Sequence, residues 1–385
     1  MNFDLTDEQL EIRSFVRELA HKEWGPACEC WEQAGGIPDA VMAQLAELGF
    51  MGLAIPEEYG GNPYDPVSTA LVIEEMAHVS ASLAICVAVH NSVGTWPIVT
   101  FGTDEQKRRY LPPMAKGMLG AFCLSEPDAG SDASHLATVA VRDGDHYVLN
   151  GAKNWVTNGA RAGLFTVLAC TDRAKRSHGV SAFLVERDAP GLVLGKKEDK
   201  MGLRASDTLA LTLEDCRVPA DSLLGAEGDG FKIAMTALDG GRIGVGAQAL
   251  GVAQAAFERA VRYSKVRQAF GSPISDLEAI QWMIADMARR LEAARWLTYH
   301  AAWLRGEGLP FSRQAAMAKL YASEAATFVT HRAIQVHGGY GYVREYLVER
   351  FYRDARVMEI YEGTSEIQRL VIARSVLKEG VAPMA

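Results

Sequence analysis

The chain has 385 residues, of which 49% are hydrophobic and 23% charged, a composition typical of a globular protein with two or three domains. Its formal net charge of −9 argues against a general nucleic-acid binder, which would normally carry a basic surface. No apolar run reaches the ~18 residues of a membrane helix, and the acidic N-terminus lacks the apolar segment of a signal peptide. We therefore expect no membrane contact, and a protein of the prokaryotic cytoplasm or a processed protein of the mitochondrial matrix.

Residues 1–118 are predicted to form a helical domain. Thr6 and Gln9 have the spacing of a capping box at a helix start. The segment TDEQKRRYLPPMAKG, residues 103–117, is predicted to be a short helix that its prolines stop. Within this domain, Cys28 and Cys30 are the only close pair of the six cysteines. No second Cys or His pair lies at the spacing of a zinc site. We expect buried free thiols and no metal.

Residues 119–225 change to short β-branched and aromatic runs, punctuated by turns such as Asn150-Gly151 and Asn158-Gly159. Strands at this spacing favour an antiparallel sheet or barrel. Strands and helices do not alternate here, so a doubly wound nucleotide-binding domain is not expected.

Residues 226–385 return to long amphipathic stretches rich in Ala, Leu, Met and Glu, which suit a four-helix bundle. The segment GVGAQA, residues 244–249, matches the glycine pattern of dinucleotide-binding loops, but the text before it is helix-like. We interpret its small residues as helix packing. The predicted fold class is therefore α+β, mainly α, in the order helices, strands, helices.

Two segments of the predicted β-domain could contact a ligand. FCLSEPDAGSD, residues 122–132, begins as a strand and breaks at Pro127 and Gly130, as an ordinary hairpin or a ligand-binding loop would. In NGAKNWVTNGARA, residues 150–162, Trp155 and Thr157 share one strand face. These two side chains could flank a planar ligand, or Trp155 could pack in the core.

Two segments of the C-terminal domain raise the same question. In RQAFGSPI, Arg267 stands between two helices, where it could clamp a phosphate or simply favour a helix end. In IQVHGGYGYVREY, Gly338 and Gly339 are predicted to end a helix and could let backbone amides approach a ligand. His337 could be a helix cap or a ligand contact.

The segment IYEGTSEIQRL, residues 360–370, contains a predicted helix start. Ser365 and Gln368 have capping-box spacing, so we expect the helix to begin near Thr364 or Ser365. Glu366 then lies in the first turn, where the helix dipole favours an acid.

Two other glutamates precede this helix. Glu362 lies beside Gly363, where a carboxylate can reach an open cavity and gain basicity if it is partly buried. Glu359 is predicted to pair with Arg353 or Arg356.

Together these segments resemble the acyl-CoA dehydrogenase family over essentially the full chain, with a texture nearest to the short-chain branch. The resemblance implies an N-terminal helical domain (1–118), a β-barrel-like domain (119–225) and a C-terminal four-helix bundle (226–385). The motifs that carry it, in the family's order, are FCLSEPDAGSD, NGAKNWVTNG, KKEDKMGLRASDT, LDGGRIGVGAQALG, RQAFG, QVHGGYGY and IYEGTSEIQRLVIAR.

The resemblance implies noncovalent FAD, an acyl-CoA substrate and a homotetramer built as a dimer of dimers. The flavin ring would lie against the β-domain, and the rest of the FAD would cross a subunit interface. The residues implied for FAD are Phe122, Leu124, Ser125, Gly130, Ser131, Trp155, Thr157, Arg267, Phe270, Gln335, Val336, His337, Gly338, Gly339, Thr364 and Glu366. Those implied for the acyl-CoA are Ser131, Asp239, Arg242 and Gly363.

The resemblance also implies the reaction. Glu362 matches the catalytic base, which removes the α-proton of an acyl thioester while the β-hydrogen leaves as a hydride to the flavin, giving a trans-2-enoyl-CoA. Hydrogen bonds to the thioester carbonyl, one from the backbone N–H of the base, would stabilise the developing enolate. An electron-transfer flavoprotein would then accept the electrons.

Departures from the family pattern and three alternatives stay open. Glu278 stands where the family often has glutamine, Asp128 replaces a loop glycine, and Gly240-Gly241 occupy the place where some branches put their catalytic acid.

The chain could instead act on a branched or dicarboxylic short acyl-CoA. Less favoured are an acyl-CoA oxidase, which commonly has a long C-terminal extension, and a non-enzymatic DNA-binding or assembly protein, which the net charge and Glu362 disfavour.

Overall fold

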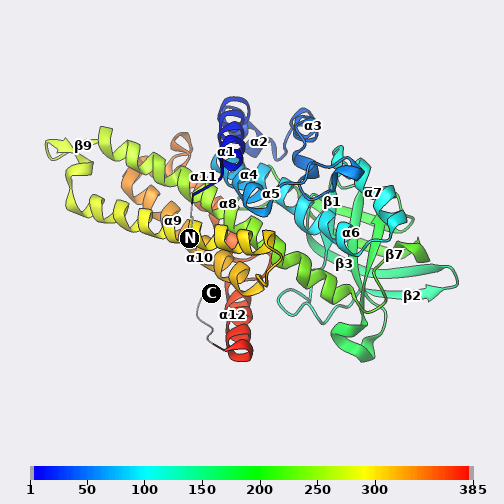
Figure 1. Ribbon diagram of the computed structural model, residues 1–385. Helices are drawn as coiled ribbons and strands as arrows, with labels where there is room; N and C mark the ends of the chain where they lie inside the picture. Colours follow the sequence, from blue (N-terminus) through cyan, green and yellow to red (C-terminus); the bar gives the residue numbers. More distant parts are fainter. Residues whose placement is uncertain (1–3, 381–385) are drawn as a thin grey trace.

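The computed structural model describes residues 4–380, which follow the order helices, strands, helices (Figure 1). This order confirms the predicted fold class. Long helices run through the middle of the molecule, and the sheet lies at one end of them. The N-terminal helices are α1 (Asp7–Leu19), α2 (Cys28–Ala34), α3 (Asp39–Glu47), α4 (Pro66–Val79), α5 (Ala81–Val89), α6 (Trp96–Phe101) and α7 (Asp104–Ala115), with a π-helical turn, η4 (His90–Thr95), between α5 and α6.

The strands and C-terminal helices complete the chain. The main sheet contains β1 (Gly120–Cys123), β2 (Val139–Asp143), β3 (His146–Thr157), β4 (Leu164–Cys170), β5 (Val180–Glu186), β6 (Leu192–Lys197), β7 (Thr208–Pro219) and β8 (Leu223–Leu224). The later elements are α8 (Gly230–Val266), β9 (Gln268–Ala269), β10 (Ser272–Pro273), α9 (Glu278–Gly306), α10 (Ser312–His337), α11 (Val348–Arg356), the 3-10 turn η10 (Val357–Glu359) and α12 (Ser365–Glu379).

The N-terminal helices confirm one local prediction and correct another. Thr6 and Gln9 form the predicted capping box, each side chain accepting the other's backbone N–H. The prediction that prolines stop α7 is wrong, since Pro112 and Pro113 lie inside the helix. Leu111 and Met114, on either side of them, are fully buried, and this burial outweighs the two missing backbone donors.

The stretch Ala81–Phe101, which covers α5, η4 and α6, is long and apolar enough to span a membrane, although the sequence analysis expected no such run. In this fold 78% of its apolar window is buried. His90, inside the stretch, accepts the N–H of Gly120 at 3.1 Å and donates to the carbonyl of Met51 at 2.9 Å. These bonds tie the helix to the start of the sheet.

The main sheet is mixed, whereas an antiparallel sheet or barrel was expected. Its strand order is β6-β7-β3-β2-β4-β5-β8, and β1 pairs with β4. The β1–β4 and β2–β4 pairs are parallel and the other pairs are antiparallel. The parallel partners are joined by long connections, for which the local turn signals of the sequence give no register.

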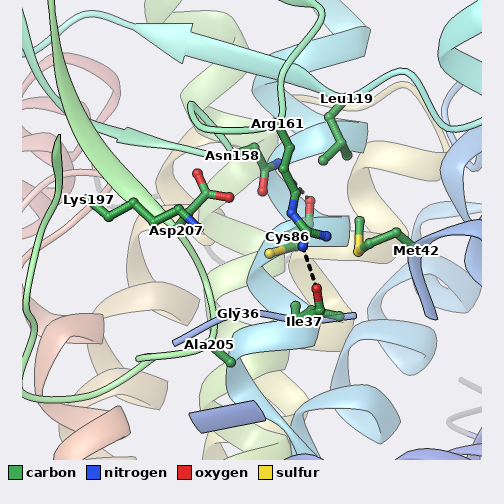
Figure 2. Close-up of a pocket in the computed structure, with 10 residues that line it drawn as sticks. All are labelled: Gly36, Ile37, Met42, Cys86, Leu119, Asn158, Arg161, Lys197, Ala205 and Asp207. Carbon is green, nitrogen blue, oxygen red and sulfur yellow. Dashed lines mark hydrogen bonds between the residues drawn. The ribbon is translucent and has the colours of Figure 1, made fainter. Parts of the chain in front are cut away.

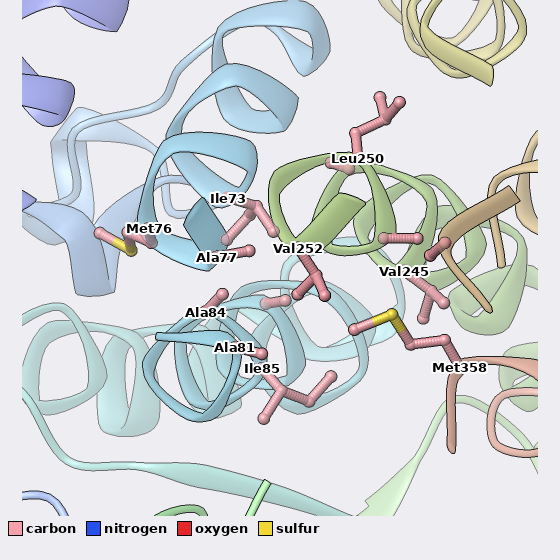
Figure 3. Packing of buried hydrophobic residues seen from close by; sticks show 14 of the residues in the cluster. Ile73, Met76, Ala77, Ala81, Ala84, Ile85, Val245, Leu250, Val252 and Met358 are labelled. Atoms are coloured by element: carbon pink, nitrogen blue, oxygen red, sulfur yellow. The ribbon is translucent and has the colours of Figure 1, made fainter. Parts of the chain in front are cut away.

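The long helix α8 is the central packing element and contains the GVGAQA segment. Gly251 brings it against α4, because a Cβ there would lie 2.1 Å from the carbonyl oxygen of Glu74. Val252 of α8 points towards α5 in the core, and Val245 lies beside Met358 (Figure 3). Within the GVGAQA segment, a Cβ on Gly246 would lie 3.0 Å from Oγ1 of Thr298 on α9, so this glycine allows close helix packing, as interpreted from the sequence.

All six cysteines are free thiols. Five are buried, as predicted, but Cys30 is exposed. Burial raises the pKa of Cys86 and of Cys123 to about 12, so these thiols stay protonated at neutral pH.

A buried ion pair organises the β-domain beside the FCLSEPDAGSD loop. Lys153 and Glu126 lie 2.6 Å apart, and their side chains are 0% and 2% exposed. Glu126 also accepts the backbone N–H groups of Ala137 and Thr138, while Lys153 donates to the carbonyl of Leu124. The pair therefore fixes the path of the chain between β1 and β2.

We predict that Lys153→Met destabilises the protein by about 3–5 kcal/mol, because it leaves the Glu126 carboxylate buried without its cation. Arg217→Met is the matched control, since the Arg217–Asp143 pair is equally short but exposed, and should cost below about 1 kcal/mol. Urea unfolding of the two variants measures the difference. Equal losses in both would contradict the role given to the buried pair.

Candidate active site

Glu362 lies in the short segment between η10 and α12, in a backbone conformation that only glycine adopts easily. Its φ is 49°, and that of Gly363 is 90°. A non-glycine residue in the left-handed region costs about 1–3 kcal/mol and persists only where the surroundings impose it. Here Lys319 donates to the carbonyl of Gly363 at 2.7 Å, and Gln368 donates to the carbonyls of Glu362 and Gly363 at 3.2 and 2.9 Å.

Tyr361 holds the other side of the same segment. Its hydroxyl donates to the side-chain oxygen of Gln248 on α8, and the Gln248 amide donates to the carbonyl of Ala81 at 2.8 Å. This chain of hydrogen bonds joins the segment to α8 and to the start of α5. The position of Glu362 is therefore set by three helices, α8, α10 and α12, and not by the loop alone.

The carboxylate of Glu362 is buried against the backbone of α8. Its Oε2 has no hydrogen-bond partner within residues 4–380, and a Cβ added to Gly241 would lie 2.1 Å from it. Burial raises the pKa of Glu362 to about 7, although the nearby cations Lys319 and Arg242 lower it. A raised pKa was expected for Glu362 if its carboxylate was partly buried, and the physical cause of the rise is desolvation.

Lys319 and Gln368 hold the Glu362 segment, and neither was expected from the sequence to do so. Lys319 is fully buried, and its pKa is lowered to about 8 by burial, with Glu362 acting in the opposite direction. Its signal was a lone lysine within the apolar run AAMAKLYASEAA. The predicted capping box of Ser365 with Gln368 is wrong, because Thr364 is the N-cap and Gln368 turns toward the loop carbonyls.

The two flanking glutamates have the ordinary roles expected of them. Glu366 lies in the first turn of α12 and is exposed. Glu359 pairs with Arg356 at 3.0 Å and accepts the hydroxyl of Thr327, whereas Arg353 pairs with Glu349.

The structure brings three of the four predicted acyl-CoA residues close to Glu362. Asp239 and Arg242 form an ion pair one turn apart on α8, on either side of Gly240-Gly241. Gly363 follows Glu362 directly, and the charge of Arg242 acts on the Glu362 carboxylate. Ser131 lies apart from these in an exposed loop of the β-domain.

A second group of predicted residues gathers where the loop after β1 meets β3. The N–H of Asn154 donates to the carbonyl of Ser125 at 2.9 Å. The next residue, Trp155, has a φ of 61° at a bulge in β3 and is 64% exposed. Its packing in the core, one of the two alternatives, is therefore wrong. A bulge that turns a tryptophan outward beside Thr157 suits a planar ligand.

A small cavity lies where β3 ends, at the junction with the N-terminal helices (Figure 2). Asn158 donates to the carbonyl of Cys86 at 3.1 Å, and Arg161 donates to the carbonyl of Ile37 at 2.5 Å. Its volume of about 10 Å³ is room for one water at most. The cavity therefore serves no substrate, and the bonds around it fix the β-domain to the helices.

The third group lies around the β9–β10 hairpin. The guanidinium of Arg267, at the end of α8, lies 5.6 Å from the ring centre of Tyr340. Phe270 forms the hairpin tip with a φ of 55° and is 94% exposed. Gly338 ends α10, as predicted, beside the exposed Gln335.

The side chain of His337 is not available to a ligand. It stacks on Tyr263 with ring centres 4.3 Å apart, and its Nδ1 donates to the carbonyl of Ala333 at 2.7 Å. Val336 is buried as well. Of these two residues, only backbone groups could contact FAD.

Thr364 and Glu366 lie at the start of α12, close to Glu362, and the other predicted FAD residues of one chain form two separate sets. Trp155 lies in β3, whereas Arg267 and Phe270 flank β9 at the end of α8, and Figure 1 shows β9 and β3 at opposite ends of the molecule. The 37 residues of α8 correspond to a length of roughly 55 Å. The two sets are therefore too far apart to contact the same FAD molecule within a single chain.

Three family models match the chain in order, and they cover most of it. They describe the N-terminal domain (residues 6–118), the middle domain (residues 121–216) and the C-terminal domain (residues 228–377) of acyl-CoA dehydrogenases. The chain belongs to the acyl-CoA dehydrogenase family. It is thus an oxidoreductase acting on acyl-CoA, as the sequence analysis expected.

This acyl-CoA dehydrogenase is 50% identical over 376 residues to the mitochondrial short-chain specific acyl-CoA dehydrogenase of Bos taurus, covering 97% of the chain and 91% of that protein. Its fold matches butyryl-CoA dehydrogenase of Megasphaera elsdenii with a TM-score of 0.95 at 45% identity, covering 98% and 100% of the two chains. A structure described under the electron transferring flavoprotein of Acidaminococcus fermentans matches with a TM-score of 0.96 at 48% identity, again over 98% and 100%.

An acyl-CoA dehydrogenase of Bacillus anthracis complexed with FAD also shares the fold, with a TM-score of 0.91 at 36% identity over 98% of this chain and 68% of that one. FAD is accordingly the cofactor of this family member. The outward Trp155 on its bulge and the arginine beside the exposed hairpin fit the flavin and phosphate ends of such a cofactor.

Gly241→Ala should abolish most of the flavin reduction by substrate, by about 100-fold or more, because the new methyl group would displace the Glu362 carboxylate. Gly244→Ala is the control on the same helix, since its Cβ would meet only Ala88 at 3.6 Å. Stopped-flow absorbance of the FAD-loaded variants compares them. A normal rate of flavin reduction in Gly241→Ala would show that the reaction does not require the Glu362 carboxylate to lie against Gly241.

Proposed function

We propose that this enzyme dehydrogenates short, unbranched acyl-CoA thioesters to trans-2-enoyl-CoA, with Glu362 as the base. The observation that carries the proposal is the buried Oε2 of Glu362, which has no partner within residues 4–380 and lies against Gly241. An unpartnered carboxylate oxygen with a pKa of about 7 is suited to accept a proton near neutral pH.

The residues around Glu362 prepare it for this step. Lys319, Gln368 and Tyr361 fix the backbone of the Glu362 segment. The carboxylate is therefore held in one position, and the active site needs little reorganisation before proton transfer. Glu362 would remove the α-proton onto Oε2, while the backbone of the same residue would help to bind the thioester carbonyl. FAD, when bound, supplies the acceptor for the hydride that leaves the β-carbon.

The hydrogen bonds next to Glu362 support a short acyl chain. Tyr361 and Gln248 bridge α8 and α5 immediately beside the base, and breaking this bridge would leave the buried carbonyl of Ala81 without its donor. We place the acyl tail along α8 from Gly241 towards Gln248, where a long tail would have to displace this bridge. Both bridging side chains are neutral, so they offer no cation to the second carboxylate of a dicarboxylic acyl-CoA.

Electron acceptance by an electron-transfer flavoprotein is part of the same proposal. Its support is the family membership together with the matching fold of the structure described under the electron transferring flavoprotein of Acidaminococcus fermentans.

We further propose that each FAD site is completed by a second copy of the chain, within a homotetramer. The two sets of FAD residues lie at opposite ends of α8 in one chain, and an antiparallel partner would bring the Arg267–Phe270 hairpin of one copy to the Trp155 region of the other. The 94% exposure of Phe270 at the hairpin tip supports this contact.

Glu362→Gln should keep FAD but lose anaerobic bleaching by butyryl-CoA by about 1,000-fold or more, because the amide cannot accept the proton. In the unmodified enzyme the bleaching rate should rise with pH through about 7 and level off above it, since only the ionised carboxylate acts as a base. Glu359→Gln, three residues away, is the control. Fast bleaching by Glu362→Gln would overturn the assignment of the base.

Co-expression of two tagged variants, Trp155→Ala and Arg267→Met, tests the shared FAD site. Each variant alone should bind FAD weakly. Random pairing would give hybrid dimers with one intact site, so about a quarter of the wild-type FAD content should return. If hybrids purified through both tags bind no more FAD than either parent, the site is not shared between chains.

A further inference from the structure

A second cavity lies on the side of α8 away from Glu362. Its volume is about 180 Å³, and its lining comes from the segment before α4, from α4 itself, from α5 to α6, and from α8 and α9. It has room for about six waters or for a small organic molecule. Gly240 and Gly244 of α8 line this cavity, whereas Gly241 faces Glu362, so the helix backbone separates it from the base.

The lining of this cavity is apolar except for one cation and a few neutral polar groups. Ile73, Ile243 and Trp96 supply apolar surface, and Arg305 is the only charged residue among the sixteen that line it. No carboxylate stands beside Arg305 in the lining, and within residues 4–380 no acidic group is found to act on its guanidinium.

Arg305 is held in place without being neutralised. Its guanidinium lies 5.8 Å from the ring centre of Trp96, and a Cβ on Gly240 would lie 2.8 Å from Nη1. Burial lowers the pKa of Arg305, and no nearby acid offsets that effect. A partly buried arginine without a counter-ion is costly, and an anion in the cavity would remove most of the cost.

We propose that this cavity binds a small organic carboxylate with a short aliphatic tail. The carboxylate would accept two parallel hydrogen bonds from the guanidinium of Arg305, and the aliphatic tail would lie against Ile73 and Ile243. The volume limits the tail to a few carbons, and the apolar lining favours such a molecule over an inorganic anion. The site is distinct from the substrate site, because it holds neither Glu362 nor the Asp239–Arg242 pair.

Calorimetric titration of the FAD-loaded enzyme with sodium acetate, butyrate and hexanoate, at constant ionic strength, tests the proposal. Hexanoate should bind with a Kd of about 1 mM, and each added methylene should tighten binding about three- to fourfold. Glu362→Gln should bind hexanoate as the wild type does. No heat at 20 mM hexanoate, or sulfate binding as tightly as hexanoate, would overturn the proposal.

Arg305→Gln should weaken hexanoate at least tenfold, and Arg305→Lys should give an intermediate loss, because lysine keeps the charge without the fork. Arg289→Gln is the control on the same helix, since Arg289 pairs with Asp286 at the surface, and it should bind normally. FAD content and the melting temperature confirm folding of each variant. Unchanged binding in Arg305→Gln would overturn the proposal even if every variant folds.

Discussion

The whole site depends on holding one carboxylate out of water. The Glu362 carboxylate can be buried only because Gly241 has no side chain, and it stays there because Lys319 and Gln368 bind the carbonyls of its own segment. The raised pKa follows from this burial. It also has a cost, because the folded protein binds the Glu362 proton more tightly than the unfolded chain. Glu362 therefore reduces stability progressively as the pH rises from about 4.5 to about 7.

The rest of the fold serves this placement. Helix α8 carries the Gly240-Gly241 pair, the Asp239–Arg242 ion pair and Gln248, so one rigid element positions the groups around the Glu362 carboxylate. The buried Lys153–Glu126 pair does similar work in the β-domain, because it fixes the loop that meets Trp155. Rigid supports on both sides leave little freedom to the groups that must meet the substrate.

Much of this was predictable from the sequence, because it is local. The capping box at Thr6, the first-turn position of Glu366 and the eligibility of Glu362 all follow from spacing over a few residues, and the choice of Glu362 came from the family resemblance. Contacts between distant residues were not predictable. Nothing near Lys319 shows that it will bind the carbonyl of Gly363, and nothing in β1 shows that it will pair in parallel with β4. The capping role predicted for Gln368 was wrong for the same reason, since its side chain binds carbonyls of the preceding loop and not the start of its own helix.

The titration of Glu362 itself tests the account most directly. Infrared difference spectra of the substrate-free, FAD-loaded enzyme, with Glu362→Gln subtracted, report the protonation of this single carboxyl group. We predict a midpoint near pH 7, with the protonated form dominant below it. A midpoint near 4.5, the ordinary value for glutamic acid, would show that the carboxylate is solvated, and would contradict the claim that its burial makes it the base.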